Sequence, residues 1–230
     1  MTPPSPIELE ALSLSLKVAF WSTLITLPIG IFTAWLLARK DFYGRAFLNG
    51  IVYLPLVLPP VVIGFFLLSL LGQNGPIGEI LNNIFGITVI FTWQGAAIAS
   101  GIMSFPLMVR AIRISFETVD RKLEAAARTL GASPFRVFYS ITLPLISPGI
   151  LAGTLLAFAR SIGEFGATIT FVSNIPGETR TLPLAIYSLV QTPGGNTGAL
   201  RLVILSVITA LLALLISEYL ANRARRSIGT

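Results

Sequence analysis

The side chains that could act on a ligand or a partner gather in two stretches of an otherwise apolar sequence. The first, DRKLEAAARTLGASPFRVF at residues 120–138, combines charges, three consecutive alanines and a glycine. The second, RSIGEFGATITFVSN at residues 160–174, holds an Arg and a Glu among hydroxyl groups. The chain has no His and no Cys, which removes the commonest general base, all disulfides and most metal sites. With no His, no Cys and no facing pair of carboxylates, an intramembrane enzyme is not expected.

In the second stretch, Glu164 follows Arg160 by four residues, so the spacing predicts an i, i+4 ion pair. An anion would be attracted by Arg160, once Glu164 is neutralised, and by nearby hydroxyl and backbone N–H groups. We therefore take this stretch as a candidate pathway or gate. Its residues are Arg160, Glu164, Thr168, Thr170, Ser173 and Asn174. The alternative is that the Ser and Thr hydroxyls only bond the backbone of their own helix, as is common in membranes.

Composition decides what kind of element must hold these residues. Of the 230 residues, 54% are hydrophobic and 11% are charged, too few charges for the surface of a soluble domain. Crossing ~30 Å of hydrocarbon takes about 20 apolar residues. We therefore predict an all-α integral membrane protein, one membrane domain over residues 1–230. Five stretches are long enough to cross: 11–38, 46–71, 88–109, 137–159 and 199–220.

The connection at residues 162–192 is harder to interpret. FGATITFV is too short to cross, and LPLAIYSLV is bounded by Pro183 and a TPGG turn. Such pieces are typical of a re-entrant or interfacial segment. A sixth crossing here is the alternative, but it would spoil the charge pattern.

Basic residues are enriched on the cytoplasmic side of membrane proteins. Five crossings with the N-terminus outside and the C-terminus cytoplasmic place twelve of the 16 basic residues inside. The twelve are Arg39, Lys40, Arg45, Arg110, Arg113, Arg121, Lys122, Arg128, Arg136, Arg223, Arg225 and Arg226. The net charge of +6 therefore indicates membrane topology and gives no reason to expect a nucleic-acid partner.

Two of the expected spans contain prolines. LPLVLPP holds Pro55, Pro59 and Pro60, and LPLISPG holds Pro144 and Pro148. Each proline removes an intrahelical hydrogen bond and can bend the helix. The bends are either static kinks or hinges beside a pathway.

Residues 120–138 are expected to form two short helices. Asp120 can cap the first, and Gly131 suits the left-handed conformation that ends it. Ser133 can cap the second helix, with Pro134 at its first position. Apolar residues recur at intervals of three and four, which predicts a single apolar stripe. The stripe is Ile112, Phe116, Val119, Leu123, Ala126 or Ala127, and Leu130.

Two interpretations of this stripe remain. One is an amphipathic helix lying on the membrane surface. The other is a docking helix, in which Ala125, Ala126 and Ala127 let a partner approach closely and basic residues pair with acidic groups on that partner. Contact with lipid alone more often uses Leu or Phe at such positions.

The segment EAAARTLGASPFRVFYSITLPL resembles the EAA loop of ABC-transporter permeases, with Gly131, Ile141, Leu143 and Pro144 at matching positions. One position departs from the family pattern, because Ala125 stands where the family has Glu, and Glu124 comes one residue early. The resemblance implies that residues 120–144 are a cytoplasmic coupling loop that docks into an ATPase subunit. The coupling residues it implies are Glu124, Ala125, Ala126, Ala127, Arg128, Gly131, Ala132 and Pro134.

Further segments, including LPLVLPPVVIGF and FARSIGEFGATITFVSNIPGETRTLPLAIYSLVQTPGG, extend the resemblance to permeases of oxyanion importers, most closely those for molybdate. Sulfate, thiosulfate and tungstate permeases share much of the pattern. The resemblance implies a type I importer permease in the inner (plasma) membrane and a second copy of the chain. It also implies a pair of cytoplasmic ATPase subunits and a periplasmic or extracellular binding protein.

The chain contains no G-x-x-x-x-G-K-[ST] phosphate-binding motif, so ATP and Mg²⁺ are expected in the partner ATPase and no cofactor in this chain. A secondary anion transporter is the alternative of another class. Such proteins usually carry ionisable residues within the membrane for coupling. The candidates here, among them Lys17, Arg160 and Arg201, all lie near the ends of spans.

Overall fold

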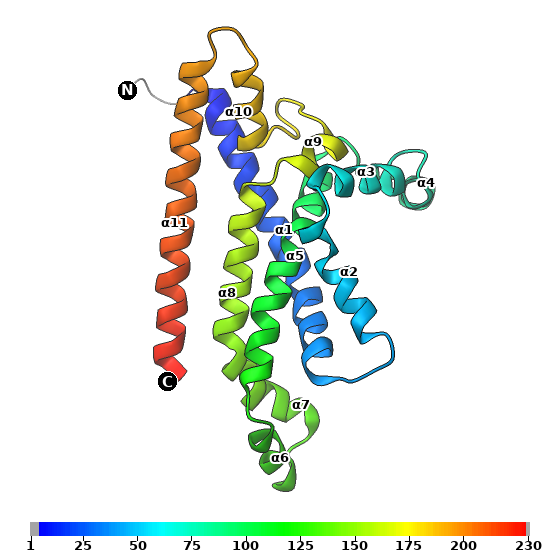
Figure 1. Ribbon diagram of the computed structural model, residues 1–230, viewed down its shortest axis with the longest axis vertical. Coiled ribbons are helices and arrows are strands. Elements are labelled where there is room, and N and C mark those ends of the chain that lie inside the picture. Colours follow the sequence, from blue (N-terminus) through cyan, green and yellow to red (C-terminus); the bar gives the residue numbers. More distant parts are fainter. Residues whose placement is uncertain (1–4, 229–230) are drawn as a thin grey trace.

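A computed structural model describes residues 5–228, and from residue 214 onward it describes mainly the backbone. Within that range the chain is helical, without a strand. Four long helices run along the molecule: α1 (Pro6–Arg39), α5 (Trp93–Thr118), α8 (Leu143–Ile162) and α11 (Asn196–Ile228) (Figure 1). The length and apolar composition of the described helices give four membrane spans, or five if one bent pair counts as a span. This confirms the predicted all-α membrane class.

Helix α5 is the centre of the bundle, because it packs against both α1 and α8. Small residues allow this close approach. Gly149 and Gly153 of α8 face α5, and a Cβ at Gly149 would clash with Ser115. Lipid gives helices no hydrophobic reason to associate, so van der Waals contact between small residues is the usual driving force.

The second predicted span is not one continuous helix. It consists of α2 (Arg45–Val57) and α3 (Pro60–Leu71), which are bent by 114° at Leu58 and Pro59. Neither Pro59 nor Pro60 has an N–H to continue the hydrogen-bond ladder, so the helix ends and restarts. The prolines predicted this bend, and residues 46–71 form one of the five predicted spans if the bent pair is counted as a single span. Helix α3 turns across the bundle and leads to α4 (Pro76–Phe85) (Figure 1).

The connection after α8 contains two short helices, α9 (Gly166–Val172) and α10 (Leu182–Val190). Their seven and nine residues are too few to cross the hydrocarbon, and neither is among the spans found in the described chain. Helix α9 packs against α3. The short helices agree with the interpretation as a re-entrant or interfacial segment, which stays a prediction.

Helix boundaries differ from the expected spans by several residues. The third span starts at Trp93 instead of residue 88 and continues to Thr118. The fourth is preceded by α7 (Pro134–Val137) and a π-helical turn, η1 (Phe138–Thr142). Hydropathy marks apolar length, whereas caps such as Thr92, which accepts from the N–H of Gly95 at 3.2 Å, set the real ends.

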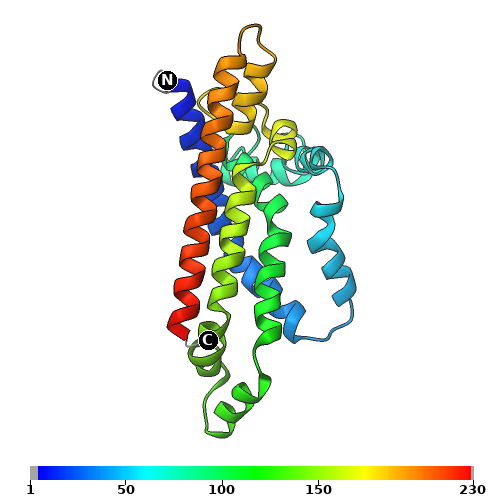
Figure 2. The ribbon, with the colours of Figure 1, turned by 60° about the vertical axis from the view of Figure 1, so that its left-hand side comes forward.

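The two ends of the bundle differ in what they carry. Helix α6 (Arg121–Thr129) and α7 project beyond the lower ends of α5 and α8, at the end where α1 and α11 also finish (Figures 1 and 2). The N-terminal end of α1 lies at the opposite end. The side chains of Arg223, Arg225 and Arg226 lie outside the described residues, although the backbone of α11 carries them to the end that holds α6.

Candidate functional site

The polar hairpin at residues 120–138 is built from local caps. The Oδ1 of Asp120 accepts a hydrogen bond from the N–H of Lys122 at 2.9 Å and begins α6. Gly131, with a φ of +84°, ends it, and the N–H of Ala132 donates to the carbonyl of Ala127 at 3.0 Å. The hydroxyl of Ser133 then accepts from the N–H of Arg136 at 3.3 Å to start α7. The predicted pair of helices and its caps are confirmed.

The predicted apolar stripe is not one continuous face. Ile112 and Phe116 are fully buried in the core, whereas Leu123 is 50% and Leu130 is 88% exposed. The change occurs because the chain turns into an extended conformation at Val119, so that α6 leaves the direction of α5. The apolar residues do recur at helical intervals, but they belong to two helices, α5 and α6, that point in different directions. They therefore do not form one face.

Helix α6 presents an uncovered surface. None of its residues is buried, and Ala125, Ala126 and Arg128 are exposed while Ala127 is partly exposed. The surface continues past the turn at Gly131 and the half-buried Ala132 to Pro134, which is also exposed. A rigid helix whose small side chains and apolar neighbours face outward is suited to close contact with another protein.

Glu124 is the exception on α6, because its carboxylate faces the body of the protein. Its Oε1 lies 3.1 Å from the Nη2 of Arg39, at the last turn of α1. The same oxygen accepts from the hydroxyl of Thr142 at 2.8 Å, at the end of the π-helical turn. Sequence analysis named Glu124 as a coupling residue but did not predict that Arg39 and Thr142 are its partners. No local signal marks these partners, since Arg39 lies 85 residues away along the chain.

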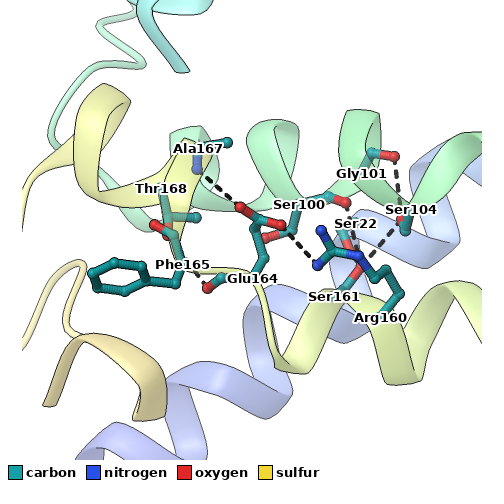
Figure 3. Close-up of polar contacts among 10 residues, drawn as sticks. All are labelled: Ser22, Ser100, Gly101, Ser104, Arg160, Ser161, Glu164, Phe165, Ala167 and Thr168. Carbon is teal, nitrogen blue, oxygen red and sulfur yellow. Dashed lines mark hydrogen bonds and ion pairs between the residues drawn. The ribbon is translucent and has the colours of Figure 1, made fainter. Parts of the chain in front are cut away.

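The second candidate site lies where α8 meets α9. Glu164 is buried, and its Oε2 lies 2.8 Å from the Nη1 of Arg160, so the predicted ion pair is confirmed (Figure 3). The other carboxylate oxygen accepts from the N–H of Ala167 at 2.9 Å. The Arg160 side chain keeps 30% of its surface exposed. The Glu164 carboxylate is thus compensated by a cation and a backbone N–H, and part of the Arg160 side chain remains exposed.

A cluster of buried serines adjoins this pair. The hydroxyl of Ser161 accepts from Ser22 at 3.0 Å and donates toward Ser104, 3.2 Å away (Figure 3). The carbonyl of Ser100 lies 3.5 Å from the same hydroxyl. The cluster joins α1, α5 and α8 at one level. Sequence analysis missed it, although Ser100 and Ser104, four residues apart within an apolar span, are a signal that could have been used.

The two threonines among the remaining pathway candidates bond the backbone of their own helix, and Asn174 bonds a residue of α10. Thr168 is fully buried and donates to the carbonyl of Phe165 at 2.8 Å, and Thr170 donates to that of Gly166 at 2.9 Å. Asn174 donates to the hydroxyl of Ser188 at 2.6 Å, whereas Ser173 is exposed. In the single chain, Arg160 is the charged member of this group with free surface. The pathway role of all six residues stays a prediction.

Comparison with known proteins gives the class first. Residues 26–226 match the family of binding-protein-dependent transport system inner membrane components, and the chain belongs to that family. It is therefore a multi-pass inner-membrane permease subunit of an ABC transporter, and not itself catalytic. The bacterial ABC importer of the polysaccharide alginate has the same type I permease fold, with a TM-score of 0.76 at 19% identity, over 95% of this chain and 80% of that one.

Relatives narrow the class further. The chain is 61% identical over 222 residues to the molybdenum transport system permease protein ModB of Escherichia coli K12, covering 96% of this chain and 97% of that protein. It is 56% identical over 223 residues to ModB of Haemophilus influenzae, covering 97% of each chain. The resemblance to molybdate permeases that the sequence indicated is thereby confirmed.

Proposed function

We propose that this chain is the membrane-spanning subunit of an ATP-driven molybdate importer. The observation that carries the proposal is the 61% identity to ModB of E. coli over nearly the full length of both chains. Two copies would form the pathway, two cytoplasmic ATPase subunits would bind ATP and Mg²⁺, and a periplasmic or extracellular binding protein would deliver the anion. Sulfate, thiosulfate or tungstate is the alternative cargo.

The orientation in this proposal puts the N-terminus outside and the C-terminus in the cytoplasm. Its support is the coincidence of the α6–α7 hairpin, the basic end of α1 and the end of α11 at one end of the bundle (Figure 1). Cytoplasmic ends of membrane proteins are enriched in Lys and Arg. A cytoplasm-only reporter fused after Thr230 should be active, and a silent reporter there would contradict the orientation.

Motion of the ATPase would be transmitted from the outer surface of α6 to two membrane spans, α1 and α8. The exposed alanines would fill a groove on the ATPase, and the carboxylate of Glu124 would pass the displacement to α1 through Arg39. The bond to Thr142 would pass it to α8. The π-helical turn that ends at Thr142 favours this role, because π turns often occur at functional sites.

The pathway would pass Arg160. Its neighbour Glu164 is already compensated by the ion pair and by the N–H of Ala167, so it would not repel an oxyanion. Selection among anions would then rest mainly with the binding protein. A weak site in the membrane is sufficient, since ATP supplies the work.

Uptake of labelled molybdate tests the function. The vesicle membrane would contain this chain, with the ATPase and ATP on the inside and the binding protein on the outside. We expect uptake that requires ATP and the binding protein and is suppressed by unlabelled molybdate more than by sulfate. Stronger competition by sulfate would support the alternative cargo, and uptake without ATPase would support a secondary transporter.

A further inference from the structure

A groove of about 920 Å³ lies between the lower half of α1 and the α6–η1 hairpin. One wall is apolar and belongs to a membrane-spanning helix: Pro28, Ile31, Phe32 and Trp35 of α1. Phe32 is 60% exposed, so this wall faces outward from the bundle core. The other wall comes from the hairpin and contributes Phe135 and Phe138. The groove therefore lies at the boundary between the span and its polar end.

The polar end of the groove is strongly basic. Arg39, Lys40, Arg121 and Arg128 line it, against the single acid Glu124. Arg39 is paired with Glu124. Among the described residues, no ion pair is recorded for Lys40, Arg121 or Arg128, although the ammonium of Lys40 lies 5.6 Å from the Trp35 ring. Within the described part of the chain, these three cations therefore line a groove whose one acid, Glu124, is already paired with Arg39.

We propose that this groove binds an anionic phospholipid of the cytoplasmic leaflet. The phosphate would lie among Lys40, Arg121 and Arg128, and an acyl chain would follow the wall from Trp35 to Pro28. Basic clusters directly beside a membrane span attract anionic lipids. A free anion would use only the cations and leave the aromatic wall without a function. The proposal requires the membrane placement of α1 but does not depend on which anion is transported.

The lipid would bridge α1 and the coupling hairpin, because its phosphate touches cations from both. Lys40 belongs to the segment after α1, whereas Arg121 and Arg128 belong to α6. A bound headgroup would therefore stabilise the same junction that Arg39 and Glu124 form, and it would hold α6 at the depth of the membrane surface.

Fluorescence of Trp35 provides a local test. Phe at Trp21 and Trp93 leaves Trp35 as the only tryptophan. The complex with its ATPase is placed in vesicles of equal parts phosphatidylglycerol and phosphatidylcholine, with only one of the two lipids brominated. We expect brominated phosphatidylglycerol to quench Trp35 more strongly. Lys40→Gln should lower this preference by about fivefold, the effect of one cation near a membrane surface.

Two variants keep the test specific. Lys122→Gln removes one positive charge from α6 at a position outside the groove, and it should leave the preference for phosphatidylglycerol unchanged. Lys40→Arg keeps the positive charge in the groove and should preserve that preference. Equal quenching by the two brominated lipids would overturn the proposal. So would an equal effect of Lys40→Gln and Lys122→Gln. Absence of quenching by both lipids in the complex, with quenching present in the permease reconstituted without ATPase, would show that the ATPase, and not a lipid, fills the groove.

Discussion

The hairpin at residues 120–138 and the polar cluster around Arg160 differ in where their polar and small side chains point. On α6 the small side chains face outward, and one carboxylate is held inward by Arg39 and Thr142. Around Arg160 the carboxylate and the hydroxyls of three serines have hydrogen-bond partners inside the bundle. The first region leaves its small side chains open to a partner, whereas the polar groups of the second have partners within the chain. Changes to α6 should therefore affect assembly, and changes at the cluster should affect stability.

The largest expected effect on the cluster follows Arg160→Leu. It leaves the buried Glu164 carboxylate with one backbone N–H as its partner. Loss of one member of a buried ion pair typically costs about 3 kcal/mol or more. Thermal unfolding of the detergent-purified complex, followed by tryptophan fluorescence, should show a clearly lowered midpoint. Arg160→Leu with Glu164→Leu should recover part of the loss, and a double variant less stable than the single one would argue against the ion pair.

The next effect concerns docking. Ala126→Glu and Ala127→Glu each add a bulky charge where close approach is required. Overpacking alone costs ~1–3 kcal/mol, and a desolvated charge adds to it, so ATPase affinity should fall by about tens- to hundreds-fold. Pull-down of the ATPase at matched permease levels measures this. Ala126→Ser is the control, because it adds little volume and no charge and should leave ATPase recovery close to that of the wild type. Full ATPase recovery with both Glu variants would leave a surface helix on lipid as the better account.

A smaller effect is expected for Gly131→Val. An added Cβ at Gly131 would meet nothing within 4 Å, so any effect comes from the φ of +84°. A β-branched residue in the left-handed region costs roughly 1–2 kcal/mol, and the exit angle of α6 would change. Uptake should fall several-fold while membrane insertion is unchanged. Gly131→Asn should have a milder effect, because Asn tolerates this conformation. Equal uptake by the wild type and both variants would show that a glycine is not needed at residue 131 to end α6.

The smallest effect is expected for Ser161→Ala. Its neighbours keep other bonds, because Ser22 also donates to the carbonyl of Ala19 and Ser104 to that of Gly101. Hydrogen bonds between membrane helices contribute about 0.6 kcal/mol on average. The unfolding midpoint should move slightly and ATPase recovery not at all. A loss of ATPase binding in this variant would show that the two regions are not as separate as their bonding indicates.

The caps at Asp120 and Ser133, the stop at Gly131 and the Arg160–Glu164 pair were predictable because each depends on neighbours within four residues. The 114° bend at Leu58 and Pro59 was predictable only as a bend. Prolines remove hydrogen bonds, but the packing of α3 on α9 sets the direction. The inward direction of Glu124 could not be predicted, since a partner 85 residues away determines it.

The ratio of molybdate uptake to ATP hydrolysis in vesicles tests the central claim most directly, because docking and transmission use different sides of α6. Glu124→Gln keeps the outer surface and removes the charge that holds Arg39. We predict ATP hydrolysis close to wild type and uptake lower by about tenfold, as expected for the loss of a charged hydrogen bond. Exchange of the two charges, Arg39→Glu with Glu124→Arg, should restore part of the uptake, and Lys122→Gln should change neither quantity. If hydrolysis and uptake fall together, or if neither changes, Glu124 does not transmit motion from α6 to the spans.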